Sequence, residues 1–178
     1  MRINFISGPG AGKSTTVARV FSELKELKYS IEHVTEYVKA WTYIKRSVKE
    51  FDQIYIFAKQ QQAEYKFLSN GVKNIITDSP TFLSVFYSKM YISQEMADAV
   101  WKLCELYDTK YPVYNIFLER GNKTYDPNGR YQTEDEAREI DDIMWNQLIL
   151  HYPPEQCSKI PFFNKEEILK KVLDVINK

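Results

Sequence analysis

The chain alternates between short strand-like segments and longer amphipathic ones. The strand-like segments show no helical spacing of apolar residues, and their length suits strands that are buried in a sheet. They lie at 2–6, 31–35, 74–78, 112–118 and 158–163. Between them, apolar residues recur at helical spacing, as Val17, Val20 and Leu24 do. We expect helices at 13–27, at two places between 36 and 70 with a break near 47–50, and at about 80–90, 93–108, 134–150 and 165–177.

Turn and capping residues define the ends of these elements. Thr133 and Glu136 form a T-x-x-E capping box, which predicts the start of a helix there. Residues 121–132 are rich in Gly, Pro and Asn and predict a loop. The proline within 158–163 favours an edge strand. Strands that alternate with helices predict an α/β fold of three layers, with a five-stranded parallel sheet between the helices, in a single domain over residues 1–178.

Composition narrows the class of protein. Lys and Arg number 24, as do Asp and Glu, so the formal net charge is zero, and non-specific nucleic-acid binding is not the expected task. Two cysteines, Cys104 and Cys157, without a Cys/His cluster argue against a disulfide framework and a zinc site. The sequence has no secretory signal and no apolar run near the ~18 residues of a membrane span. We expect a cytoplasmic protein without a membrane partner, and the sequence leaves a homodimer open.

Residues 7–15, SGPGAGKST, follow the first strand and open the first helix. This is the context of a Walker A loop, GxxxxGK[ST], with Ser7 in place of the first glycine. Glycines let backbone N–H groups approach phosphates, and the helix start adds its dipole. Lys13 is expected to reach the β- and γ-phosphates, and Ser14 to bind Mg²⁺. The sequence therefore predicts ATP or GTP binding, with contacts from Gly8, Gly10, Ala11, Gly12, Lys13, Ser14 and Thr15.

Two carboxylates, Glu36 and Asp78, directly follow strand-like segments. In an open parallel sheet, ligands bind beyond the carboxyl ends of the strands, so both acids point to the γ-phosphate region. One of them is expected to accept a proton from an acceptor hydroxyl, and the other to hold Mg²⁺ directly or through water. We favour Asp78 as the residue that holds Mg²⁺ or acts as the base. We favour Glu36 as the residue that contacts the acceptor hydroxyl or acts as the base. Either acid could instead be a charge at a helix N-terminus.

Other motifs separate a kinase from a switch or a motor. The Asn-Lys pair at 122–123 has Tyr125 where a GTPase NKxD motif requires Asp. Remodelling ATPases usually carry an acidic pair after the Walker B strand, whereas a single acid, Asp78, ends the third strand. A small kinase fits better, because the loop at about 120–133 has the character of a lid. Closure of a lid excludes water and brings positive charge to the transferred phosphoryl group.

The cations of this region have expected roles. We expect Arg130 to act in catalysis, Arg120 to contact the nucleotide and Arg138 to contact the acceptor, with Lys123 also on the loop.

The sequence resembles small P-loop kinases of the NadR type, the ribosylnicotinamide kinase domain, within the wider nucleoside and nucleotide kinase group. Besides the Walker loop, the matching segments are TEY at 35–37, FDQIYIFAKQQQAEY at 51–65, IITDSPTFLSVFY at 75–87 and YPVYNIFLERGNKTYDPNGRYQTEDEAREID at 111–141. The resemblance implies the strand order 2-3-1-4-5, an arginine-bearing lid and phosphoryl transfer from ATP. It also likens Glu36 to the base of deoxynucleoside kinases and Asp78 to the strand-three acid of NadR-like proteins.

Aromatic residues after Glu36 could stack on the flat ring of an acceptor, although aromatics at helical spacing are more often core. The amides of Gln60, Gln61 and Gln62 could read a base, although such a run is more often a solvated helix face. The expected acceptor contacts are Glu36, Tyr37, Trp41, Arg46, Tyr55 and Arg138.

The identity of the acceptor stays open. Nucleoside monophosphate kinases commonly carry Arg directly after the strand-three acid, and Ser79 at this position favours an uncharged hydroxyl acceptor such as a nucleoside or ribosylnicotinamide. Lys39, Lys45 and Arg46 could instead hold a nucleoside monophosphate. A DNA 5′-hydroxyl or modified base, and an ATP-binding regulatory module without kinase activity, are the further alternatives.

Overall fold

The computed structural model describes residues 1–49, 51–121 and 132–178. Its centre is a five-stranded parallel sheet of order β2-β3-β1-β4-β5. The strands are β1 (Arg2–Ile6), β2 (Ile31–Val34), β3 (Asn74–Thr77), β4 (Val113–Glu119) and β5 (Cys157–Pro161). Arg2 on β1 lies beside Ile75 of β3 and Val113 of β4. The predicted parallel sheet and its strand order are confirmed, and β5 is an edge strand, as its proline indicated.

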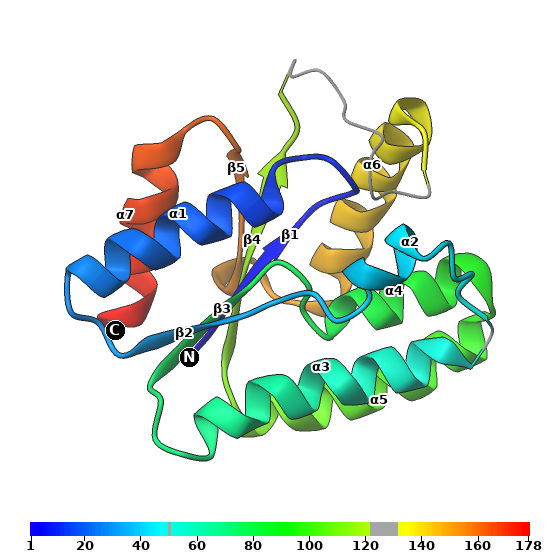
Figure 1. The fold of residues 1–178 in the computed structure, drawn as a ribbon, viewed down its shortest axis with the longest axis horizontal. Coiled ribbons are helices and arrows are strands. Elements are labelled where there is room, and N and C mark those ends of the chain that lie inside the picture. The colour runs from blue at the N-terminus through cyan, green and yellow to red at the C-terminus, as the bar shows by residue number, and fades with distance from the viewer. Residues whose placement is uncertain (50, 122–131) are drawn as a thin grey trace.

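Helices cover both faces of the sheet, as Figure 1 shows, with α1 and α7 on one side and α3, α4, α5 and α6 on the other. They are α1 (Lys13–Glu26), α2 (Lys39–Tyr43), α3 (Asp52–Leu68), α4 (Phe82–Tyr91), α5 (Gln94–Lys110), α6 (Glu134–His151) and α7 (Lys165–Ile176), with a 3₁₀ turn at Pro154–Gln156. Successive residues of a strand face opposite sides of the sheet, so Ile3 and Phe5 pack towards α1 and α7 while Ile6 packs towards α4, α5 and α6. The three-layer prediction is therefore confirmed.

The segment between β2 and α3 contains less helix than its pattern predicted. Among its described residues only α2 is helical, and Lys45, two residues beyond α2, adopts a positive φ of 53°. Tyr43 and Ile44 are mostly exposed at this point. Because the side chains at the end of α2 gain little from packing, nothing favours its extension, and the chain leaves the helix there.

Capping signals located α6 correctly. The Thr133 hydroxyl accepts the Glu136 N–H, and the Glu136 carboxylate accepts the Thr133 N–H at 2.7 Å. Most of the loop predicted at 121–132, with Lys123 and Arg130, lies outside the described residues. No helix in the described ranges is long and apolar enough to cross a membrane.

A buried ion network fixes the amino end of β1. The Arg2 side chain is 0% exposed, its Nε donates to Glu64 Oε2 on α3 at 2.8 Å, and its Nη1 is paired with Asp108 on α5. Its Nη2 donates to Thr81 Oγ1 at 3.0 Å, and the guanidinium lies 4.3 Å from the ring centroid of Tyr107. One buried cation thus joins the central strand to three segments that cover it.

Glu64→Ala leaves the Arg2 charge buried and removes one of the two carboxylates that neutralise it. We expect the free energy of unfolding to fall by about 3–5 kcal/mol, measured by urea denaturation. Glu105→Ala, which removes the exposed ion pair with Lys102 on α5, is the matched control and should cost less than about 1 kcal/mol. Equal losses in the two variants would contradict a structural role for the buried network.

Candidate active site

The loop at residues 7–12 joins β1 to α1 in the manner of a phosphate-binding loop. Gly10 and Gly12 have φ values of 79° and 92°, which side chains other than glycine rarely adopt. No side chain among the described residues caps the first turn of α1, so its leading N–H groups are available to an anion. The loop geometry therefore matches the Walker A prediction despite Ser7.

The Lys13 ammonium lies inside this loop. Its Nζ donates to the carbonyl oxygens of Ser7 at 2.7 Å and Gly8 at 2.9 Å. Burial lowers the pKa of Lys13, and the carboxylates of Glu36 and Asp78 act in the opposite direction. The charge is thus held at the loop centre, where the phosphates of a bound nucleotide would lie.

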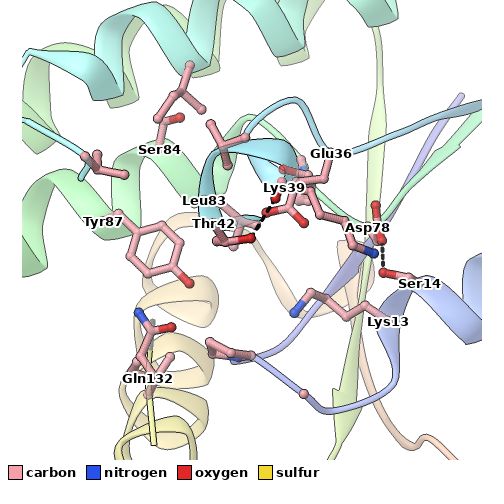
Figure 2. A pocket seen from close by; sticks show the side chains of 18 of the residues that line it. Lys13, Ser14, Glu36, Lys39, Thr42, Asp78, Leu83, Ser84, Tyr87 and Gln132 are labelled. Carbon is pink, nitrogen blue, oxygen red and sulfur yellow. Dashed lines mark hydrogen bonds between the residues drawn. The ribbon is translucent and has the colours of Figure 1, made fainter. Parts of the chain in front are cut away.

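Asp78 follows β3 and meets α1 next to the loop. The Ser14 hydroxyl donates to Asp78 Oδ2, as Figure 2 shows. Asp78 is 6% exposed, and its Oδ1 is buried without a hydrogen-bond partner among the described residues. A hydroxyl beside a carboxylate with an unpaired oxygen fits Mg²⁺, which takes oxygen ligands and keeps positions for phosphate and water. The described residues contain no cluster of three or more His, Cys, Asp or Glu side chains suited to a metal ion, so protein oxygens would supply only part of such a shell.

Glu36 follows β2 and lies on the same side of the cavity as Asp78 and Lys13 (Figure 2). Burial raises the pKa of Glu36, the Lys13 charge opposes the rise, and Asp78 adds to it. A carboxylate with a raised pKa that faces an open cavity is suited to accept a proton.

These groups line one cavity of about 1260 Å³. Its nucleotide end is formed by the Walker loop and its far end by residues of α3 and α4. The far end contains the amides of Gln53 and Gln60 and the ring of Tyr87, whose pKa is raised by burial. Gln60 Nε2 donates to Thr77 Oγ1 at 3.2 Å, while its Oε1 is buried without a partner among the described residues. The cavity is large enough for two ligands of nucleoside size side by side.

The structure brings part of the predicted site together. The cavity is lined by Gly10, Gly12, Lys13, Ser14, Thr15, Glu36 and Asp78. Gly8 and Ala11 belong to the loop but do not line the cavity. Arg120 donates to Asp141 and to the Pro9 carbonyl, and Arg130 lies outside the described residues.

Three of the predicted acceptor contacts, Tyr37, Trp41 and Tyr55, do not line the cavity. The rings of Trp41 and Tyr55 are stacked with centroids 6.3 Å apart, and the Tyr37 and Tyr55 hydroxyls are 2.7 Å apart. The Arg46 guanidinium lies 3.4 Å from the Trp41 ring centroid, and Arg138 is paired with Glu134. The three rings and Arg46 thus form one cluster outside the cavity lining, and Arg138 does not line the cavity either. Their part in acceptor binding stays a prediction.

Sequence reasoning missed the α4 side of the cavity. Leu83, Ser84, Tyr87 and Tyr91 line it, and their spacing places them on one helix face. The same spacing describes a core-facing stripe, so the pattern alone does not separate a ligand wall from packing. Of the three amides considered as base contacts, Gln60 lines the cavity and Gln61 and Gln62 do not. Gln53, seven positions before Gln60 on the same face of α3, was missed.

Comparisons with known proteins agree with this architecture. A crystal structure of NadR in complex with NR matches with a TM-score of 0.76 at 12% identity, covering 99% of this chain and 52% of the other. NadR in complex with NAD and AMP-PNP gives 0.68 at 12% identity, covering 99% and 49%. Deoxyadenosine kinase from M. mycoides with bound dATP gives 0.57 at 18% identity and full coverage of both chains.

The chain spans about half the length of the NadR chains that it matches. At these identities the likeness shows a shared fold, that of P-loop kinases. No curated protein matches the sequence. A family model described as an AAA domain matches residues 2–152. The chain therefore belongs to the AAA_28 family.

Proposed function

We propose that the chain is an ATP-dependent kinase that transfers the γ-phosphoryl group to a hydroxyl of a small nucleoside-type acceptor, either ribosylnicotinamide or a (deoxy)nucleoside. The observation that carries the proposal is the continuous cavity, which has a Walker loop at one end, amides and a tyrosine at the other, and two carboxylates beside the loop. An ATPase that transfers no phosphoryl group to an acceptor would not need the end of the cavity that contains the amides and the tyrosine. The similar structures include complexes with NR and with dATP, which supports the same acceptor class.

The two carboxylates have different surroundings, which suggests different roles. Asp78 is bonded to Ser14, so we assign these two to Mg²⁺, which would neutralise charge on the β- and γ-phosphates. Glu36 lies near Lys13 without taking part in that bond, and its raised pKa suits a proton acceptor. We therefore assign Glu36 as the base that takes the proton of the acceptor hydroxyl as the phosphoryl group is transferred to its oxygen.

Lysines at the cavity favour a second candidate acceptor. Lys39 and Lys45 line the cavity, and no arginine does so among the described residues. Lysine is a point charge without the two-pronged phosphate grip of arginine, and Ser79 directly follows Asp78. A hydroxyl acceptor is therefore preferred, and a nucleoside monophosphate is the alternative that the two lysines support.

An acceptor panel tests the reaction. ADP release should rise with one or more of ribosylnicotinamide, nucleosides and deoxynucleosides, and exceed that with the monophosphates or 5′-hydroxyl DNA. Lys13→Ala should reduce the acceptor-stimulated rate by about a hundredfold or more, because it removes a charge directed at the phosphates. Lys102→Ala, an exposed lysine on α5, is the control and should leave the rate unchanged. If no acceptor raises ADP release, the chain is an ATP-binding module and the kinase proposal is wrong.

Glu36→Gln tests the proton acceptor. The base must be ionised, so kcat/KM should be full above the Glu36 pKa and decline as pH falls through it. Because that pKa is raised, the decline should begin at a higher pH than an ordinary glutamate gives. The variant should lose this acid limb and about 10²- to 10⁴-fold of kcat. If the decline of kcat/KM at low pH is unchanged in Glu36→Gln, the proton acceptor is Asp78 and not Glu36.

Lys39→Gln and Lys45→Gln distinguish the two acceptor classes. With a nucleoside acceptor, KM should change by less than about twofold, because no phosphate is held by these lysines. With a monophosphate acceptor, KM should rise by about tenfold or more, as expected for a lost charged hydrogen bond. Lys66→Gln on α3, outside the cavity lining, is the matched control.

A further inference from the structure

One carboxylate of α6 contacts the Walker loop from behind. The Gly8 N–H donates to Asp141 Oδ1 at 2.6 Å, and Arg120 Nε donates to Asp141 Oδ2 at 2.7 Å. The side chains of Arg120 and Asp141 are only 8% and 12% exposed. A nearly buried ion pair is therefore bonded directly to the backbone of the loop.

Arg120 makes the second attachment to the loop. Its Nη2 donates to the Pro9 carbonyl at 2.6 Å and to the Ala137 carbonyl at 3.3 Å. The Gly8 N–H and the Pro9 carbonyl, one on each side of the Gly8–Pro9 peptide, are thus both held by charged groups. Charge-assisted bonds of this kind are shorter and stronger than those between neutral groups.

Glycine at position 8 is what allows this contact. A Cβ atom there would lie 2.7 Å from the Ala137 carbonyl oxygen and 2.7 Å from Asp141 Oδ1. On the inner side, Lys13 Nζ donates to the Gly8 carbonyl at 2.9 Å. The Gly8 backbone is therefore fixed through its N–H from α6 and through its carbonyl from the catalytic lysine.

The geometry points to Asp141 as a positioning residue for the nucleotide, acting with Arg120 through the loop backbone. This inference rests on the nucleotide site of the proposed function and not on the identity of the acceptor. The pair also places a carboxylate near the phosphates at little electrostatic cost, because Arg120 neutralises it. Arg120 is bonded to the loop in this structure, and its predicted contact with the nucleotide stays a prediction.

Binding of a non-hydrolysable ATP analogue tests the inference independently of any acceptor. Asp141→Ala should raise the Kd of the analogue by about tenfold or more, as expected from the loss of charged hydrogen bonds. In turnover, KM for ATP should rise while KM for the acceptor stays within about twofold. Asp142→Ala, the exposed neighbour on α6, is the matched control and should bind the analogue normally.

Two further variants separate positioning from folding. Asp141→Asn keeps the side-chain size and an oxygen for the Gly8 N–H but removes the counter-charge of Arg120, so its Kd should lie between those of wild type and Asp141→Ala. Arg120→Ala with Asp141→Ala removes both charges, and its effect should be smaller than the sum of the single effects if the pair acts as a unit.

Three results would overturn the inference. One is a folded Asp141→Ala variant, judged by its thermal midpoint, with an unchanged Kd. Another is that Asp141→Asn lowers the thermal midpoint and leaves the Kd of the analogue unchanged. The third is that Arg120→Ala weakens binding of the analogue, Asp141→Ala does not, and the double variant binds like Arg120→Ala. Arg120 would then be a direct nucleotide contact. Failure of the kinase proposal appears separately, as normal analogue binding without acceptor-stimulated ADP release.

Discussion

The parallel pairing of β1 with both β3 and β4 is the constraint on which the site depends. Parallel strands bring their carboxyl ends to one edge of the sheet, so the segments after β3 and β4 meet the loop after β1. Asp78 reaches Ser14 from one side, and Arg120 reaches the Pro9 carbonyl from the other. At the opposite end, the buried Arg2 network joins β1 to the helices that cover it.

Charge in the site is balanced locally rather than across the chain. Lys13 is directed at loop carbonyls, and Arg120 is neutralised by Asp141. The zero net charge of the sequence therefore does not describe the field at the loop, where Arg120 and Asp141 are nearly buried and charges interact more strongly than in water. A bound triphosphate would meet the Lys13 ammonium at the loop centre and the Arg120–Asp141 pair behind the loop.

The two halves of the cavity differ in how they are built. The proposed nucleotide half is made mostly of residues 9–15, with Glu36 and Asp78 brought beside them by the sheet. The proposed acceptor half is made of side chains from α2, α3 and α4, such as Lys39, Gln53 and Tyr87, which are far apart along the chain. Helix faces can vary without altering the sheet, which is how one fold serves many acceptors.

The sequence by itself determined the elements that depend on local chemistry. The strand segments, the Walker loop and the Thr133 capping box follow from apolar spacing, glycine and side-chain caps, each within a few residues, and Glu36 and Asp78 follow from their places after strands. The strand order came only through the resemblance to known kinases. Tertiary structure decided which aromatic residues face the cavity, because Trp41 and Tyr87 have similar helical settings but pack against different neighbours. It also decided the partners of Arg120, because the contact with Asp141 joins residues 21 positions apart and depends on the approach of α6 to Gly8.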